Sequence, residues 1–413
     1  MKLKVNKEFL ITLLLVYNST YSSVVAFSYF TLIFSLILVL CLFLKNKFKI
    51  DSLFKKFTIL FFLISLYLYL SLPYFDVLLT GYNYLKFLYA YLSIKIIGFN
   101  FFKYIVRIAY YGSIISFPFY LFQMLNYDLA FKIVGFIQNS FDFLSWRNHQ
   151  MANNIIFTIN GDGALRNSGF MWEPKGFASF ILISIIFRLM LNNLKIDRKI
   201  FVFVLAIIST FSTTGLLGLF LITTFYFLNK TPIVSLTLFP LFLIFSYNIF
   251  LNSDILYDKI LYELSLQNEY ETLLKKTDYE SDSYSLGRTG SFIVDFNDFL
   301  KRPYLGYGFT RENRTQSAYV KLVRVNGFSD LLAVYGLGII LYFYRYYIFL
   351  RFINLKRYKY LSILLLTFLF IYFASTLTCH PFWLSLLFVT LIAPNYIPPN
   401  KSINYSKIKI NYE

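Results

Sequence analysis

The residues best suited to chemistry are basic side chains and one carboxylate in polar stretches between long apolar runs. The planar guanidinium group of arginine matches phosphate oxygens, and lysine offers a compact positive charge. A nearby carboxylate could accept a proton from a hydroxyl. The candidate anion ligands are Arg166, Lys175, Arg288, Arg302, Arg311 and Arg314, and Glu173 is the candidate base. The alternative is that the basic residues bind phospholipid headgroups or form ion pairs within loops.

Glu173 comes directly before Pro174 and a long apolar run. Proline suits the first turn of a helix, because its missing N–H would have no partner there. Glu173 is therefore predicted at the N-terminal end of a helix, where a negative charge is favoured. Its position allows two roles, a helix cap or a proton acceptor.

The longest polar stretch, residues 251–326, holds 11 of the chain's 21 acidic residues. A segment this polar cannot lie in hydrocarbon, so it is predicted to form a domain on the solvent side of a membrane. Residues 254–276 predict an amphipathic helix on the membrane or the domain, and residues 291–300 predict another helix. Gly306 and Gly308 predict a tight turn where a ligand could approach the backbone.

The composition is that of a polytopic membrane protein. Hydrophobic residues make up 58% of the 413 residues and charged residues 15%, and apolar runs recur along most of the chain. The net charge of +18 does not indicate nucleic acid, because the basic residues cluster in short loops between apolar runs. This is the positive-inside pattern that sets the orientation of membrane proteins.

A spanning helix needs about 20 mostly apolar residues. We therefore predict an all-α integral membrane protein, a single membrane domain over residues 1–413 with both termini in the cytoplasm. Twelve spans are predicted, at 9–26, 28–44, 57–73, 83–100, 104–124, 176–193, 200–213, 215–229, 232–250, 328–350, 360–378 and 381–394. This number places the basic loops inside and two long loops outside, at about 125–175 and 251–327.

Other common functional motifs are absent from the sequence. No Walker A sequence supports ATP-driven transport, no HExxH sequence occurs, and His149 and His380 lack partners at zinc-binding spacing. We therefore expect no metal and no cofactor. The hydroxyl-rich stretch 209–215 could line a polar cavity, although such hydroxyls more often bond to carbonyls of their own helix.

Several short motifs resemble those of the O-antigen polymerase and ligase superfamily. Arg166-x-x-Gly169-Phe170 with Trp172-Glu173-Pro174 is similar to the family's RxxGxxxEP sequence at the start of a helix. Phe211-Ser212-Thr213-Thr214-Gly215 is similar to its TxSxTG helix break. Four further motifs are similar to the family's large-loop pattern: Gly287-Arg288, Pro303-x-Leu305-Gly306-x-Gly308, Asn326-Gly327 and Gly336-Leu337-Gly338.

This resemblance implies a membrane-embedded glycosyltransferase of the bacterial inner membrane. Its donor would be an undecaprenyl-diphosphate-linked oligosaccharide at the periplasmic face, and a sugar hydroxyl would displace the lipid diphosphate. Arg166 and Arg288 would bind the diphosphate, and Glu173 would act as the base. From the residue chemistry we further expect Lys175, Arg302, Arg311, Arg314 and Asn326 to contribute to substrate binding. The further partners would be membrane lipids, a flippase and a chain-length regulator.

One departure from the family pattern bears on the reaction. Many members, ligases in particular, carry His before the Asn of the large loop, whereas this chain has Val325 before Asn326. This favours a polymerase over a ligase that transfers glycan to lipid A-core or protein. A third alternative is a transporter of lipid-linked oligosaccharide, which would carry basic residues within its helices and have short outer loops.

Overall fold

The computed structural model describes residues 6–20, 29–140, 151–161, 163–230, 283–316, 321–352, 359–377 and 380–391. These residues are mostly helical, with two small two-stranded sheets. The predicted span at 232–250 and the predicted amphipathic helix at 254–276 lie outside the described residues.

The first part of the chain is helical apart from one hairpin. Its elements are α1 (Lys7–Tyr17), α2 (Tyr29–Lys45), α3 (Ser52–Ser71), α4 (Val77–Ile97), α5 (Asn100–Leu125), α6 (Tyr127–Ser140), β1 (Met151–Asn153), β2 (Thr158–Asn160), α7 (Pro174–Leu191), α8 (Arg198–Ser209) and α9 (Thr213–Lys230). Strands β1 and β2 pair antiparallel. The predicted outer loop at 125–175 thus contains a helix and a hairpin that the sequence analysis did not predict.

The later part contains a small mixed unit and then further helices. The α12–α13 unit consists of β3 (Ser283–Ser285), α12 (Gly287–Lys301), the 3-10 helix η2 (Arg311–Asn313), β4 (Lys321–Val323) and α13 (Gly327–Tyr335). Strands β3 and β4 pair in parallel. The chain continues through α14 (Gly338–Phe352), α15 (Leu361–Ala374), α16 (Pro381–Ser385) and the 3-10 helix η5 (Leu386–Leu391). The helix predicted at 291–300 is confirmed by α12.

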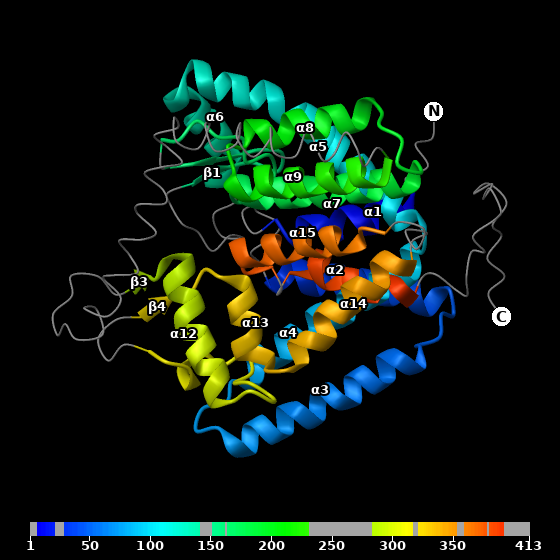
Figure 1. The fold of residues 1–413 in the computed structure, drawn as a ribbon, viewed down its shortest axis with the longest axis vertical. Coiled ribbons are helices and arrows are strands. Elements are labelled where there is room, and N and C mark those ends of the chain that lie inside the picture. Colours follow the sequence, from blue (N-terminus) through cyan, green and yellow to red (C-terminus); the bar gives the residue numbers. More distant parts are fainter. Residues whose placement is uncertain are drawn as a thin grey trace.

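Figure 1 shows α7, α9 and α15 side by side in the middle of the molecule, with α3 along one edge and the α12–α13 unit at one end. Helix α7 packs against α5, α8 and α9, and α9 packs against α15. Because α7 is apolar around its whole circumference, it is buried along nearly its whole length. It forms the centre of the core.

Among the described residues, three helices are long and apolar enough to cross a membrane by length and composition, namely α3, α5 and α7. They differ in burial: 83% of the apolar window is buried in α7, but only 11% in α3. Helix α3 exposes large apolar side chains such as Phe62, Leu66 and Leu70. An exposed apolar surface of this kind is typical of a helix that faces lipid, so the structure supports association with a membrane.

The first predicted span, 9–26, is wrong in its extent, because α1 ends at Tyr17. The side chains of Asn18, Ser19 and Thr20 donate hydrogen bonds to backbone carbonyls of the preceding turn, at 2.9, 3.0 and 2.9 Å. Short polar side chains compete in this way with the helical pattern of hydrogen bonds. Three consecutive residues of this type end the helix.

Two predicted spans near the C-terminal end of the described chain are interrupted. The helix predicted at 328–350 is broken at Gly336, which has a φ of 57° and separates α13 from α14. Glycine tolerates this left-handed conformation because it has no Cβ. Of the helix predicted at 381–394, the structure describes residues 381–391, which form five α-helical residues followed by 3-10 helix.

The predicted tight turn at Gly306 and Gly308 is confirmed, since both residues have positive φ. The part of the protein that approaches this turn is the end of α13. The Tyr307 and Gly308 N–H groups donate to the carbonyls of Ala333 and Val334 at 2.9 and 3.1 Å. A Cβ on Gly306 would lie 2.5 Å from those same carbonyl oxygens. The turn therefore pairs helix-end carbonyls that would otherwise lack partners, and α13 fills the space considered for a ligand.

Gly327, the first residue of α13, lies against the end of α15, where a Cβ would stand 2.0 Å from the Ser375 carbonyl oxygen. We predict that Gly327→Ala lowers the unfolding free energy by about 1–3 kcal/mol, the usual cost of overpacking. Thermal unfolding of the purified protein in detergent measures this. The control is Gly81→Ala in α4, where a Cβ would meet nothing within 4 Å. Equal melting temperatures for the two variants would contradict the close approach.

Candidate functional site

The segment that carries Arg166 rests on the break between α8 and α9. The backbone N–H of Asn167 donates to the Ser209 carbonyl at 3.0 Å. The Asn167 side-chain amide donates to the hydroxyls of Ser209 and Ser116 at 2.9 and 3.0 Å. Asn167 is fully buried, so these bonds fix the half-buried Arg166 beside the hydroxyl-rich stretch. Two of the motifs identified in the sequence therefore lie in contact.

The hydroxyl-rich stretch is a strained break. Phe211 has a φ of 45°, a left-handed conformation that is unfavourable for an aromatic residue. The hydroxyls of Ser209 and Thr210 donate to carbonyls of their own helix at 2.8 and 2.6 Å, which confirms the back-bonding interpretation for these two residues. The Ser212 hydroxyl accepts the Gly215 N–H at 3.3 Å. Such strain persists only where the surrounding structure enforces it.

Glu173 occupies the N-cap position of α7 with Pro174 as the first helical residue, as predicted. Its side chain makes no capping hydrogen bond. Instead one carboxylate oxygen accepts the indole N–H of Trp172, and the other lies 3.1 Å from the Lys175 ammonium group. The Glu173 side chain is 30% exposed. The structure therefore presents an oriented carboxylate that remains partly open to solvent or substrate.

His380 packs against Trp172, whose indole N–H donates to the Glu173 carboxylate; the two ring centroids are 5.9 Å apart. It is the N-cap residue of α16 and precedes Pro381, so the His380–Pro381 pair repeats the arrangement of Glu173 and Pro174. Burial, with a smaller contribution from Lys86, lowers the pKa of His380 to about 3. His380 was considered only as a zinc ligand in the sequence analysis. The sequence signal that could have identified His380 is that, like Glu173, it directly precedes a proline at the start of a helix.

Arg288 is the second residue of α12 and is half-buried. Its backbone carbonyl accepts the side-chain amide of Asn326 at 3.3 Å. The Asn326 side-chain oxygen caps α13 by accepting the N–H groups of Phe328 and Ser329, both at 3.1 Å. Asn326 is 0% exposed. Both ends of its amide group are used inside the protein, where they join the start of α13 to the backbone at Arg288; a role of Asn326 in substrate binding stays a prediction.

Contacts and short stretches of chain link the segments that carry these charges. Gly327, next to Asn326, packs on Ser375 at the end of α15. Five residues further along the chain, His380 contacts Trp172. Before Trp172 in the chain, Gly169 packs against α7, since a Cβ on Gly169 would touch the ring of Phe177. Arg166, Glu173 and Lys175 are thus carried by segments that meet around the start of α7, and Arg288 is linked to them indirectly, through Asn326, Gly327 and the end of α15.

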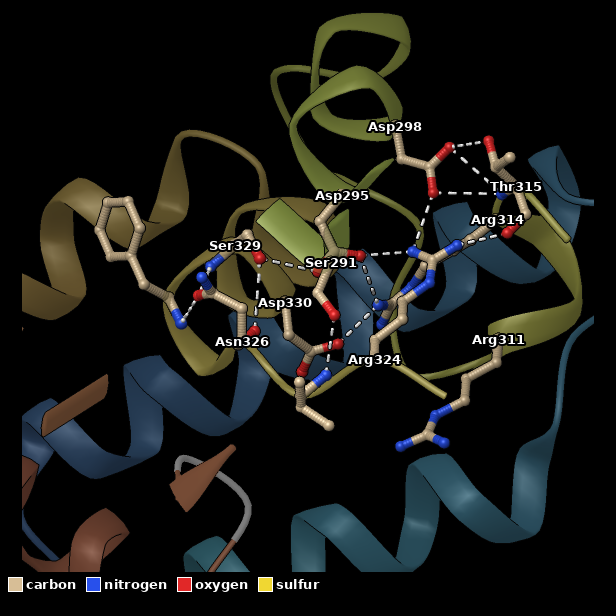
Figure 2. A network of polar contacts seen from close by, with 12 residues as sticks. Ser291, Asp295, Asp298, Arg311, Arg314, Thr315, Arg324, Asn326, Ser329 and Asp330 are labelled. Atoms are coloured by element: carbon tan, nitrogen blue, oxygen red, sulfur yellow. Dashed lines mark hydrogen bonds and ion pairs between the residues drawn. The ribbon is translucent and has the colours of Figure 1, made fainter. Parts of the chain in front are cut away.

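The other predicted arginines lie elsewhere in the α12–α13 unit. Arg314 is 5% exposed and donates to Asp330 at 2.6 Å and to the Gly308 carbonyl at 3.3 Å. Arg302 donates to the carbonyl of Ser71, the last residue of α3, at 3.4 Å. Arg311 is exposed and stands apart from the contacts drawn around it (Figure 2). Arg302 and Arg314 therefore have structural partners, and none of the three joins the segments around α7.

This unit also contains a buried ionic network that was not predicted from the sequence, shown in Figure 2. Arg324 donates to Asp295 and Asp298 on one face of α12, and the Ser329 hydroxyl donates to Asp295 at 2.8 Å. Burial and the neighbouring Asp330 raise the pKa of the Asp295 carboxyl from 3.8 to about 6, against the opposing effect of the arginines. The i, i+3 spacing of the two α12 aspartates was a usable signal. Their partner is 26 and 29 residues away in sequence, so the pairing could not be deduced.

No protein-family model matches this chain, and neither a curated protein nor a solved structure matches it. Within the described part of the chain, no group of three or more His, Cys, Asp or Glu residues could hold a metal ion. The arrangement around α7 offers positive side chains for an anion beside an oriented carboxylate. That combination suits transfer from a phosphate leaving group to a hydroxyl.

We predict that Arg324→Ala destabilises the protein strongly, because it leaves Asp295 and Asp298 buried without their shared partner. Breaking a buried ion pair from one side costs about 3–5 kcal/mol. Thermal unfolding in detergent, with limited proteolysis within 283–335, measures the loss. Arg311→Ala, which removes an exposed arginine of the same unit, serves as the control. Equal stability of the two variants would mean that the network does not hold the unit together.

Proposed function

We propose that this protein is a membrane-embedded glycosyltransferase that polymerises O-antigen or a similar surface polysaccharide. It would join repeat units carried on undecaprenyl diphosphate at the periplasmic face of the bacterial inner membrane. The observation that carries the proposal is that the segment bearing Arg166 lies against the start of α7, where Glu173 and Lys175 form an ion pair. Arg288 is linked to this site through Asn326, Gly327 and the end of α15. These residues come from motifs widely separated in sequence, and they supply an anion site and a base.

In the proposed reaction, a hydroxyl of the acceptor sugar attacks the anomeric carbon of the donor. The new carbon–oxygen bond forms as the bond to the lipid diphosphate breaks, and the diphosphate leaves with the bonding electrons. Arg166 and Arg288 offset the charge that develops on the diphosphate. Glu173 takes the hydroxyl proton. Lys175, which lies 3.1 Å from Glu173, can interact with the carboxylate or with the phosphate oxygens.

The proposed topology has twelve spans, both termini in the cytoplasm and the two long loops outside. The count of twelve rests on the apolar runs of the sequence. What supports a common inner side is a group of polar and charged contacts at the helix ends opposite the candidate site. There Lys95 pairs with Asp51 at 3.1 Å, at the end of α4 and the start of α3. At the same ends, Asn100 of α5 donates to Glu8 of α1 at 2.8 Å. A flippase would supply the lipid-linked units, a chain-length regulator would act with the polymerase, and membrane lipids would surround the helices.

The polymerase is favoured over a ligase by the residue before Asn326. That residue is Val325, whose backbone N–H donates to the Ser291 hydroxyl of α12 at 3.0 Å. An apolar side chain at this position offers no group for proton transfer, whereas the histidine of family ligases would. The transporter alternative has less support, because Arg166, Glu173 and Lys175 gather around the start of one helix and not along a path between helices.

We predict that Arg166→Ala and Arg288→Ala each reduce chain extension by roughly tenfold to a hundredfold, because a hydrogen bond to a charged group contributes about 1.5–3 kcal/mol. Arg→Lys at either position should restore activity only partly, since the planar fork is lost. The measurement is polymer length and amount at matched protein levels in membranes. Arg198→Ala, an exposed arginine at the opposite end of α8 from Ser209, is the control. Full activity in both alanine variants would show that these arginines only hold loops in place.

Deletion of this protein distinguishes a polymerase from a ligase. A polymerase joins repeat units while they are still on the lipid carrier, so its deletion leaves the later transfer step intact. We expect the deletion strain to display a single repeat unit on the final acceptor and to lose the ladder of longer chains. Gel analysis of the surface glycan and of carrier-linked lipid measures both pools. Long polymer accumulating on the carrier would instead identify a ligase.

A further inference from the structure

Trp172 is fixed at a junction of three helices. Its backbone N–H donates to the Thr20 carbonyl, just beyond the end of α1, at 3.0 Å. Its indole ring lies over the first turn of α7, where a Cβ on Gly176 would stand only 3.0 Å from the ring. Trp172 is 9% exposed. The indole therefore has little freedom to turn, and its N–H points in a fixed direction.

That direction is toward Glu173. The indole N–H donates to one carboxylate oxygen, and the Lys175 ammonium group lies 3.1 Å from the other. The two contacts differ in kind, because a lysine side chain is flexible whereas the indole is rigid and packed. The direction of the carboxylate is consequently set by Trp172. A carboxylate oxygen has two lone pairs, so each oxygen can still accept a further proton donor.

His380 supports the other side of the indole. The two rings are tilted by 33° with centroids 5.9 Å apart. The start of α16 is anchored just beyond the end of α1, because the Phe382 N–H donates to the Ser19 hydroxyl at 2.8 Å. Because burial holds the pKa of His380 near 3, the imidazole is neutral at working pH. Its contact with Trp172 is therefore one of packing.

We propose that Trp172 is a positioning residue for Glu173, with the His380 ring as its packing support. The inference rests on the proposed function, because it assigns the group that aims the base at the acceptor hydroxyl. In this role Trp172 acts on the chemical step and leaves donor binding to the arginines. Its loss should lower kcat and leave KM for the lipid-linked substrate nearly unchanged.

The first experiment measures chain extension by the full-length protein in membrane vesicles. Trp172→Phe keeps an aromatic ring and removes the indole N–H, and should lower kcat by about tenfold or more with KM within about twofold. The matched control is Trp383→Phe, because the buried Trp383 N–H has no hydrogen-bond partner among the described residues. His380→Phe should retain activity, whereas His380→Ala should lose it. Unchanged kcat in Trp172→Phe, or loss of activity in both His380 variants, would overturn the proposal.

A second readout does not depend on activity. The chain has three tryptophans, so ¹⁵N-labelled indole groups give three N–H resonances, which Trp→Phe variants assign. Glu173→Gln should shift the Trp172 resonance and leave that of Trp383 in place. No shift at Trp172 would overturn the proposal, whatever the kinetics. If the wild-type protein extends no chains, the proposed function fails, and the indole resonance alone then decides whether Trp172 holds Glu173.

Discussion

The burial of α7 is the constraint on which the rest of the structure depends. This helix is apolar on every side, so other elements must surround it, and α5, α8 and α9 do so. Helix α9 approaches closely through two glycines: a Cβ on Gly215 or Gly218 would lie 2.7 or 2.4 Å from Ala178 or Leu182 of α7. Small residues permit such close packing between helices. The fixed start of α7 then gives Glu173 a rigid base.

Backbone contacts at helix ends connect this core to the α12–α13 unit. The turn at Gly306 pairs carbonyls at the end of α13, and Gly327 lies against the end of α15. Asn326 joins the starts of α13 and α12, and so fixes the backbone at Arg288. These glycine-containing motifs resembled ligand-binding loops, yet their contacts are with the protein's own backbone. They support the candidate site without forming it.

The charges fall into two groups with different physical roles. The arginines of the buried network face aspartates at short range, and their removal would leave buried charge uncompensated. Glu173 and Lys175 are less buried, so water screens their interaction and their pairing contributes little to stability. A pair of this second kind can exchange its partners for a substrate at small cost. This difference, more than residue type, separates Arg314 from the groups proposed to act on substrate.

The sequence by itself determined that the chain is mostly helical and apolar, that a helix begins at Pro174, and that another helix occupies residues 291–300. These features follow from local rules: apolar runs, the backbone of proline, and helical periodicity. Only the tertiary structure decided that Asn326 joins the start of α13 to the backbone at Arg288, that Arg314 is buried, and that His380 packs against Trp172. These facts depend on contacts between residues far apart in the chain. The composition of a segment does not determine which distant segment packs against it. The burial and the partners of a charged side chain are therefore known only from the folded structure.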